Sequence, residues 1–343
     1  MKRLLLGLTA LLLLSPPLRA ADSAKRPLHV FILAGQSNME GHASVKLLDY
    51  QATLPANSAL FAPFRKDNRW IERDDVWIKF LDRHGKLTVG YGVHGCIGPE
   101  LGFGAVVGDH YHSPVLLIKT AWGGRSLYRD FRPPSAGLPS EKVLDKMLAD
   151  ARKHKPGTTI DDIKKPFGAS YRAMLEEIRD TLANLKGLFP EYADQGYQID
   201  GFVWFQGWND MINPEATAEY TSNLTHLIRD VRADLNNPKL PVVVGQFGVD
   251  GAEANANETK FKLAQAAVMD VPEFQGNVAL VKTDRFWDTE AAAVFKKGWR
   301  EHKDEWNKVG SEFPYHYLGS VKTMIQIGEA FGKSMLELRG EKQ

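Results

Sequence analysis

The sequence predicts an α/β protein, a three-layer α/β/α sandwich around a central parallel sheet of about five strands. Short apolar runs alternate along the chain with longer segments that have helical spacing. Each run is apolar almost throughout, which is typical of strands in a parallel sheet that helices cover on both faces. The composition agrees, because 43% hydrophobic and 25% charged residues in a chain of 343 are globular rather than disordered values.

Five apolar runs are predicted as the strands of this sheet. The first is rich in β-forming residues and ends at Ala34-Gly35, and the second is followed by the pair Gly123-Gly124. In chain order, the predicted strands cover residues 28–33, 115–120, 199–205, 240–244 and 278–281.

Helices are predicted between these strands and after the last one, because apolar residues recur there three or four positions apart. Pro99 suits the first turn of one helix, and Asn213 is the predicted N-cap of another. The predicted helices cover residues 99–111, 170–188, 214–235, 259–269 and 321–338.

Two stretches interrupt this alternation and are interpreted as insertions at the end of the sheet where ligands bind. Residues 45–92 contain a predicted hairpin between about 76 and 89. Residues 128–168 contain a Pro-rich turn and a short helix near 141–152.

The first twenty residues are typical of a secretory signal peptide. A basic start precedes an apolar run from Leu4 to Leu14, and Ala20 offers a small residue for cleavage. The run is too short for a membrane-spanning helix, which needs about twenty apolar residues. We therefore expect residues 1–20 to be removed, leaving residues 21–343 as one secreted or periplasmic domain with no membrane attachment.

Charge and cysteine content exclude several functions. The formal net charge is +1, which argues against a nucleic-acid-binding protein. Cys96 is the only cysteine, which excludes an intramolecular disulfide, a multi-cysteine zinc site and a cysteine-ligated iron–sulfur cluster.

The sharpest chemical signal is the run Gly35-Gln36-Ser37-Asn38-Met39, directly after the first strand. A serine at this edge of a sheet has an exposed hydroxyl on a rigid backbone, as a nucleophile requires. The alternative is a tight turn in which Ser37 or Asn38 caps the next helix.

Two further blocks follow the second and third strands. The glycine pair Gly123-Gly124 lets a backbone N–H approach a reacting oxygen, although a turn that needs positive φ also explains it. In the run 204–211, Gln206 and Asn209 can donate amide N–H groups to an oxyanion. The alternatives are that Gln206 holds the loop and that Asn209 or Asp210 caps a helix.

The fourth block precedes the last helix and contains His316. A histidine here can act as a general base that takes the proton of the Ser37 hydroxyl and later returns it to the leaving alcohol. A single histidine with no such role is the alternative.

The order of serine, glycine, asparagine and histidine blocks resembles the SGNH hydrolase superfamily, and more closely its sialate O-acetylesterase-like branch, the carbohydrate acetylesterases. The resemblance spans residues 28–338 and implies a flavodoxin-like strand order. It is carried by Gln36-Ser37-Asn38, Gly98-Pro99-Glu100, the run 118–124, Trp-x-Gln-Gly at 204–207 and His316-Tyr317-x-Gly319.

The resemblance also implies roles for residues. Ser37 is the nucleophile, and His316 is the base. An acyl-enzyme forms and water cleaves it to acetate, with no metal or organic cofactor. The implied oxyanion donors are the N–H of Ser37, the N–H of Gly124 or of Gly123 beside it, and the Asn209 side chain. Apart from the resemblance, the residues themselves make Gln36, Gln206 and Arg125 candidate supporting or substrate-binding residues, and Arg125 could hold a sugar or a carboxylate.

The chain departs from the family pattern in two places. Trp208 stands where many relatives have glutamate, and the resulting Gly-x-Asn-Asp string matches the wider superfamily and favours Asn209 as a donor. Phe313 stands where the superfamily has the aspartate that orients the histidine. Glu312 is the nearest replacement in sequence, and a backbone carbonyl that leaves a Ser–His dyad is the alternative.

The sequence therefore predicts a secreted serine esterase that removes O-acetyl groups from a carbohydrate. A non-catalytic carbohydrate-binding relative is the first alternative, since Phe313 cannot orient an imidazole. A lipid or thioester hydrolase of the same superfamily is the second. The parent sugar, the acetyl position and the oligomeric state are not predicted.

Overall fold

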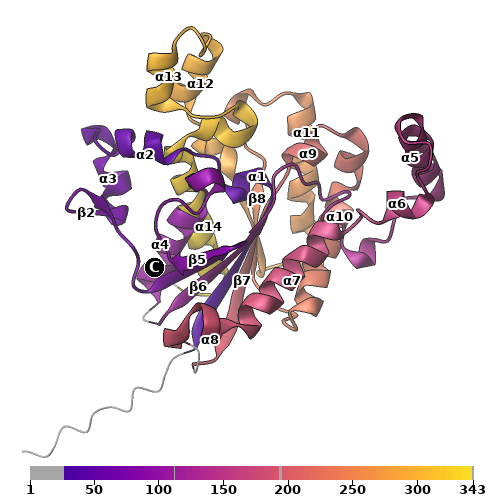
Figure 1. The fold of residues 1–343 in the computed structure, drawn as a ribbon, viewed down its shortest axis with the longest axis horizontal. Helices are drawn as coiled ribbons and strands as arrows, with labels where there is room; N and C mark the ends of the chain where they lie inside the picture. Colours follow the sequence, from indigo (N-terminus) through magenta and orange to yellow (C-terminus); the bar gives the residue numbers. More distant parts are fainter. Residues whose placement is uncertain (1–26, 112, 193–194, 342–343) are drawn as a thin grey trace, which may run out of the picture.

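A seven-stranded sheet forms the centre of the molecule, in the order β5-β4-β6-β1-β7-β8-β9 (Figure 1). The computed structural model describes residues 27–111, 113–192 and 195–341, so the predicted signal peptide lies outside the described residues. Neighbouring strands are parallel except β4 and β5. The strands are β1 (Leu28–Gly35), β4 (Val76–Phe80), β5 (Arg83–Lys86), β6 (Val115–Ala121), β7 (Tyr197–Phe205), β8 (Val242–Gln246) and β9 (Val278–Lys282).

The five predicted strands are all present as β1, β6, β7, β8 and β9. When these five strands are numbered along the chain, their order across the sheet is 2-1-3-4-5. This order confirms the predicted flavodoxin-like arrangement. The prediction of about five strands was too low. The hairpin expected in an insertion belongs to the main sheet, because β4 pairs in parallel with β6 from Val76–Val115 to Phe80–Lys119. A separate two-stranded ribbon contains β2 (Arg65–Lys66) and β3 (Arg69–Trp70).

Helices cover both faces of the sheet, as a three-layer sandwich requires (Figure 1). On one face α4 (Glu100–His110) packs against α14 (Val321–Leu338). The other face carries α7 (Ala169–Ala183) and α10 (Pro214–Asp234), and α11 (Ala256–Ala266) packs on α10.

The crossing of α4 and α14 depends on glycines. A Cβ atom placed on Gly328 of α14 would lie 2.1 Å from the carbonyl oxygen of Pro99, and one placed on Gly102 of α4 would lie 2.2 Å from that of Ile325. The two backbones therefore approach each other more closely than any side chain allows.

Local capping explains where the predicted helix bounds shift. Asn213 is the N-cap of α10, because its side chain accepts hydrogen bonds from the N–H groups of Glu215 and Ala216. Helix α11 starts earlier than predicted because Asn255 and Glu258 form a capping box. The segment predicted as one helix over 170–188 breaks at Asn184, after which α8 (Leu185–Leu188) follows.

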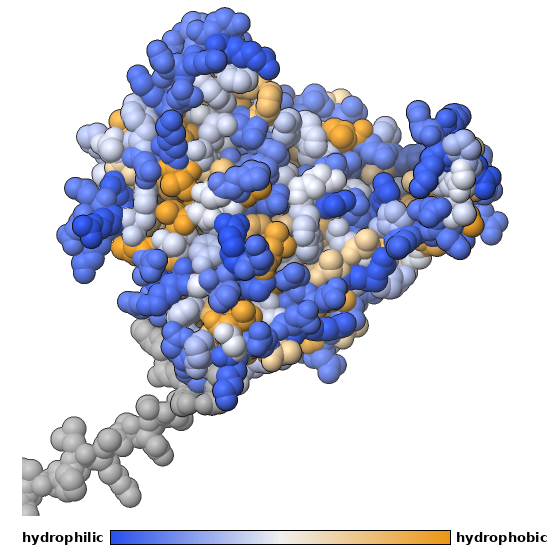
Figure 2. All heavy atoms as spheres, in the orientation of Figure 1, coloured by the Kyte–Doolittle hydropathy of each residue, from blue (hydrophilic) through white to orange (hydrophobic). Residues whose placement is uncertain are grey.

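Two groups of short helices project from the body of the molecule. Helices α5 (Glu141–His154) and α6 (Ile160–Lys164) belong to the predicted insertion 128–168 and extend beside α10 (Figure 1). Helices α12 (Thr289–Lys296) and α13 (Lys303–Val309) form a second projection, the α12–α13 lobe, which was not predicted. Both projections have mainly hydrophilic surfaces on the face that Figure 2 shows.

The 45–92 insertion contributes α2 (Val45–Gln51) and α3 (Ser58–Phe61) before it enters the sheet. Within residues 27–111, 113–192 and 195–341, no helix combines the length and the apolarity needed to cross a bilayer.

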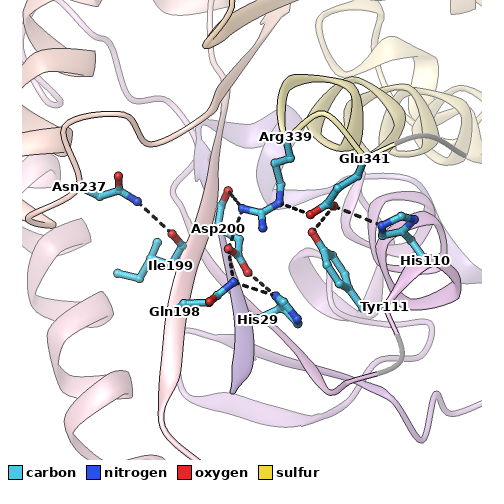
Figure 3. Close-up of polar contacts among 9 residues, drawn as sticks. All are labelled: His29, His110, Tyr111, Gln198, Ile199, Asp200, Asn237, Arg339 and Glu341. Carbon is cyan, nitrogen blue, oxygen red and sulfur yellow. Dashed lines mark hydrogen bonds and ion pairs between the residues drawn. The ribbon is translucent and has the colours of Figure 1, made fainter. Parts of the chain in front are cut away.

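A group of polar side chains, the basal polar cluster, lies where β1 and β7 begin (Figure 3). Asp200 of β7 bonds to His29 of β1 and lies 2.7 Å from the guanidinium of Arg339. Glu341 accepts hydrogen bonds from Arg339 and from the Tyr111 hydroxyl, at 3.1 and 2.6 Å. The cluster ties the end of α14 to the start of the sheet.

Candidate active site

The three predicted strand-end blocks meet at the carboxyl edge of the sheet. Strand β1 lies between β6 and β7, and Gly35 pairs in register with Ala121 on one side and with Phe205 on the other. The blocks after the three strands therefore leave the sheet at the same level. A Cβ on Gly35 would lie 2.1 Å from the Phe205 carbonyl oxygen, so this position admits no side chain.

Ser37 is the first residue of the short helix α1 (Ser37–Glu40) and is 5% exposed. Gln36 joins its block to the one after β7. Its Nε2 donates to Asn209 Oδ1 at 3.2 Å and lies 3.4 Å from Ser37 Oγ, and its Oε1 accepts from the N–H of Gly207 at 3.0 Å. The residue predicted as supporting thus lies in direct contact with two predicted members of the site.

Two of the expected oxyanion donors are connected to Ser37, Gly123 directly and Asn209 through Gln36. A Cβ on Gly123 would lie 3.8 Å from the Cβ of Ser37, so the two residues are neighbours. Gly124 has φ +70°, with open space where a side chain would be. Asn209 accepts from Gln36 through Oδ1, and its Nδ2 makes no hydrogen bond to any residue that the structure describes. That Nδ2 is available to an incoming oxygen.

His316 lies in a turn (Pro314–Gly319) between the α12–α13 lobe and α14. The turn is joined to helix α1, because Asn38 Nδ2 donates to the carbonyl oxygen of Tyr315 at 3.0 Å. Among the described residues, no hydrogen bond links the Ser37 hydroxyl to the imidazole. Catalytic hydrogen bonds often tighten only when substrate is bound.

Glu312 is the carboxylate beside His316. Its Oε2 lies 4.0 Å from Nδ1 of His316, beyond hydrogen-bond distance, while its Oε1 accepts from the N–H of Phe313 at 2.9 Å. Nδ1 of His316 is buried and lacks a partner in the described chain. Phe313, at the usual aspartate position, stacks on Tyr315 instead.

His42 is a neighbour of His316 that the sequence analysis missed. The two imidazole rings are stacked, with centroids 3.9 Å apart and planes 19° apart. Burial and the nearby charge of His42 lower the pKa of His316 to about 3. The imidazole is therefore neutral at neutral pH and can accept a proton. The one sequence signal for His42 is its place just after helix α1.

His42, Glu312 and His316 are also the described residues that could hold a metal ion, since one ligand atom of each lies within 4.8 Å of the others. However, the ring nitrogens of two stacked imidazoles direct their lone pairs along nearly parallel planes. A tetrahedral metal site needs these lone pairs to converge. The arrangement fits an interacting histidine pair better than a preformed metal centre.

Asp210, considered in the sequence only as a helix cap, connects two of the blocks. Its buried carboxylate accepts from the N–H groups of Leu127 and Tyr128, each at 2.8 Å, and from Gln206 Nε2 at 2.5 Å. Burial raises the pKa of Asp210 to about 6. The residue fixes the loop that carries Gly123 and Gly124.

The two other predicted supporting residues differ in position. Gln206 lies inside the site, where its Nε2 also donates to the Arg125 carbonyl oxygen at 3.1 Å. The Arg125 guanidinium is about half exposed and lies 3.6 Å from Asp130. Among the described residues, no hydrogen bond or ion pair joins this guanidinium to Ser37 or its neighbours in the site.

A buried ion pair supports helix α1, which carries Ser37. Lys119 Nζ lies 2.9 Å from Glu100 Oε2, and both side chains are fully buried. The ammonium also donates to the carbonyl oxygen of Glu40 at 2.8 Å, at the end of α1. Glu100 belongs to the Gly-Pro-Glu motif, which therefore has a structural role behind the site.

Comparisons with known proteins bear on the fold and the family of the chain. A probable carbohydrate esterase of Arabidopsis thaliana is 35% identical over 48 residues, which cover 14% of this chain and 18% of that protein. A crystal structure of an Arabidopsis thaliana protein has a similar fold, with a TM-score of 0.51 and 17% identity over 91% of this chain and 98% of that one. For a carbohydrate acetylesterase from Xanthomonas citri the TM-score is 0.47, at 13% identity over 92% of this chain and 57% of that one.

The family comparison covers most of the chain. Residues 27–293, which contain the blocks of Ser37, Gly123 and Asn209, match the family described as carbohydrate esterase, sialic acid-specific acetylesterase. The match ends before the turn of His316. The predicted resemblance is confirmed, and the chain belongs to this family of carbohydrate esterases.

Proposed function

We propose that the protein is a serine esterase that removes O-acetyl groups from a carbohydrate through an acyl-enzyme on Ser37. The observation that carries the proposal is the placement of Ser37 beside Gly123, with Gln36 linking it to Asn209. Membership of a carbohydrate esterase family supports the type of substrate.

In the proposed reaction, Ser37 Oγ attacks the ester carbonyl carbon while neutral His316 takes the hydroxyl proton. The negative oxygen is stabilised by the N–H groups of Ser37 and Gly124, or of Gly123, and by Nδ2 of Asn209. The ester C–O bond then breaks, and the sugar oxygen takes the proton from His316. Water, activated by the same imidazole, attacks the acyl group, releases acetate and restores Ser37.

The orientation of the imidazole depends on two contacts in this proposal. The ring of His42 fixes the plane of His316 by stacking. Glu312 can select the tautomer if its carboxylate moves from 4.0 Å to hydrogen-bond distance of Nδ1, about 1 Å closer. Nε2 then takes the proton.

A non-catalytic carbohydrate-binding protein is the second candidate. It is favoured by the unpartnered Nδ1 of His316 and by the phenylalanine at the usual aspartate position. It predicts glycan binding with no ester hydrolysis.

The deciding experiment is hydrolysis of p-nitrophenyl acetate by residues 21–343 and by Ser37→Ala. We expect Ser37→Ala to lose activity by about three orders of magnitude or more. Ser44→Ala is the matched control, because the Ser44 side chain makes no capping hydrogen bond and the variant should keep full activity. Acetate release from acetylated xylan and from O-acetylated sialic acid identifies the better substrate.

If wild type and Ser37→Ala are equally inert on every ester, the esterase proposal fails and the binding protein is the better description. If both are equally active, the nucleophile is another residue.

We also propose that the protein is exported, because residues 1–20 have the pattern of a signal peptide.

A further inference from the structure

A row of four aromatic side chains leads away from the candidate active site. Its members, here called the aromatic row, are Trp208, Tyr315, Phe313 and Trp299. The ring centroids are 5.4 Å apart between Trp208 and Tyr315 and 5.5 Å between Tyr315 and Phe313. The last step, from Phe313 to Trp299, is 6.2 Å. The row connects α9 (Trp208–Met211) to the α12–α13 lobe.

The row begins at the proposed catalytic groups. Trp208 directly precedes Asn209, and Tyr315 directly precedes His316, whose ring it meets edge-on at 4.5 Å. The Tyr315 carbonyl is held by Asn38, the residue after Ser37. An acetyl ester at Ser37 therefore has the row as its neighbour.

Core packing does not account for the whole row. Trp299 packs on Trp306 and Phe295 inside the α12–α13 lobe, so its burial has a structural explanation. Phe313 is 37% exposed, although its ring lies within 11° of parallel to that of Tyr315. Exposed aromatic surface beside a candidate active site is typical of ligand binding.

We propose that the aromatic row is a binding subsite for the sugar rings of a glycan, and that it holds a neutral pyranose chain with one acetyl ester at Ser37. The C–H face of a pyranose is apolar and flat enough to pack on an aromatic ring, while its hydroxyl groups stay in water. The inference rests on the proposed function for the position of the ester, and it extends that function to the type of ligand.

The charges around the site favour a neutral sugar. The carboxylates of Glu40 and Glu312 both lie beside the stacked histidines, since Glu40 Oε2 is 3.5 Å from His42 Nε2. They repel a carboxylate on the substrate. Arg125, the cation next to the glycine pair in sequence, is already near Asp130. A sialic acid is therefore a poorer ligand for the row than a neutral xylan chain.

The first test measures binding without hydrolysis. Ser37→Ala protein is titrated with xylohexaose, which has no ester, and with N-acetylneuraminic acid. Tryptophan fluorescence detects binding, since two of the eight tryptophans, Trp208 and Trp299, belong to the row, and calorimetry gives the affinity. We expect xylohexaose to bind the more tightly. The double variant Ser37→Ala, Phe313→Leu should bind xylohexaose about tenfold more weakly or worse, because leucine keeps the bulk of the side chain but lacks the ring.

Two variants serve as controls for this test. Phe313→Tyr keeps the ring and should bind xylohexaose as Ser37→Ala alone does. Tyr197→Ala removes another exposed aromatic residue, at the start of β7 and so at the opposite edge of the sheet, and should leave binding unchanged. Absence of xylohexaose binding, tighter binding of the acidic sugar, or equal affinity with Phe313→Leu would overturn the inference.

The second test keeps Ser37 and compares substrates. Phe313→Leu should lower kcat/KM for acetylated xylan at least about tenfold more than for p-nitrophenyl acetate, because the small ester does not extend along the row. Equal losses on both substrates would assign Phe313 to the support of His316 and overturn the subsite. If the Ser37 proposal fails while xylohexaose still binds through Phe313, the subsite stands and the esterase does not.

Discussion

Asp210 is fully buried and accepts hydrogen bonds from two backbone N–H groups of the loop that follows the glycine pair. Its carboxylate must be desolvated in the folded state, and burial therefore raises its pKa from 3.8 to about 6. In its ionised form the carboxylate holds the loop, because each of its two oxygens accepts one of these backbone hydrogen bonds. The residue thus couples the protonation of one carboxyl group to the position of the Gly123 and Gly124 N–H groups.

The raised pKa of Asp210 predicts a pH dependence of stability. Between about pH 4 and pH 6 the unfolded chain has released this proton while the folded protein still holds it, so the contribution of Asp210 to the free energy of unfolding falls as pH rises. Above about pH 6 the contribution is constant. Urea unfolding of wild type and Asp210→Asn at several pH values should show wild type losing about 1–3 kcal/mol relative to the variant across this window.

If the free energy of unfolding of wild type instead rose relative to that of Asp210→Asn between about pH 4 and pH 6, the result would contradict the raised pKa. Asp250→Asn is a suitable comparison, because burial also raises the pKa of Asp250 but that carboxylate is away from the loop. The two substitutions should both alter the pH dependence of stability, whereas Asp210→Asn alone should lower kcat.

The stacking of His42 on His316 predicts an effect on kcat. His42→Ala removes the ring that fixes the plane of the base, so we expect kcat for p-nitrophenyl acetate to fall about tenfold with little change in KM. His42→Phe keeps a flat ring and should recover most of the lost activity. Steady-state kinetics of the two variants decide the point, and equal activity of His42→Ala and wild type would show that stacking has no role.

At the scale of helices and strands, two features hold the catalytic edge in place. Lys119 of β6 supports the end of α1 through Glu40, and α14 carries the turn of His316 at its start. Helix α14 in turn lies directly against α4, because its glycines let the two backbones approach closely. The position of His316 therefore depends on a backbone contact between two helices.

This contact predicts the effect of one added methyl group. A Cβ on Gly328 meets the backbone of Pro99 and Phe103, which cannot move aside as a flexible side chain can. Gly328→Ala should lower the free energy of unfolding by about 1–3 kcal/mol, measured by urea denaturation. Gly157→Ala adds the same atom where nothing lies within 4 Å and should be close to neutral. Equal stability of both variants would show that α4 and α14 separate without cost.

Elements with strong local patterns were predicted well from the sequence. The closing helix was predicted over 321–338, and α14 has those bounds, because an apolar face and the Ser320 N-cap are both local signals. Strand β4 was assigned to an insertion because its neighbour in the sheet, β6, is far along the chain. Parallel pairing between segments that are far apart in the chain has no local sequence pattern from which it can be predicted.

The residues of the candidate site likewise fall into those with a local sequence signal and those recognised only from tertiary contacts. Ser37, Gly123, Gln206 and Asn209 follow predicted strands, so the parallel sheet alone implies that they meet. His42 and Asp210 were missed because stacking and buried hydrogen bonds arise from tertiary contacts. The family resemblance pointed to Phe313 as a departure from the pattern, but its contacts with Tyr315 and Trp299 required the structure.

At the scale of the whole molecule, the chain combines a candidate active site at the carboxyl edge of the sheet with a predicted export signal at its start. Expression of residues 1–343 in a bacterial host should give an exported protein that begins at or near Ala21, as determined by N-terminal sequencing. Replacing Leu8 and Leu11 by Asp interrupts the apolar run and should keep the protein inside the cell. Its signal peptide should stay uncleaved, apart from removal of Met1. Export of this variant at the wild-type level would contradict a signal peptide.

The basal polar cluster affects how the protein can be fused to another protein or immobilised on a solid support. It brings the start of β1 and the end of α14 together, through the shared contacts of Asp200 with His29 and Arg339, at the edge of the sheet away from Ser37. A fusion partner, a resin or a cell wall joined at either end of the domain therefore leaves the catalytic edge facing outward. An enzyme immobilised in this way can work along an insoluble polymer, and a short peptide that joins the two ends would permit circular permutation with the active edge uncut.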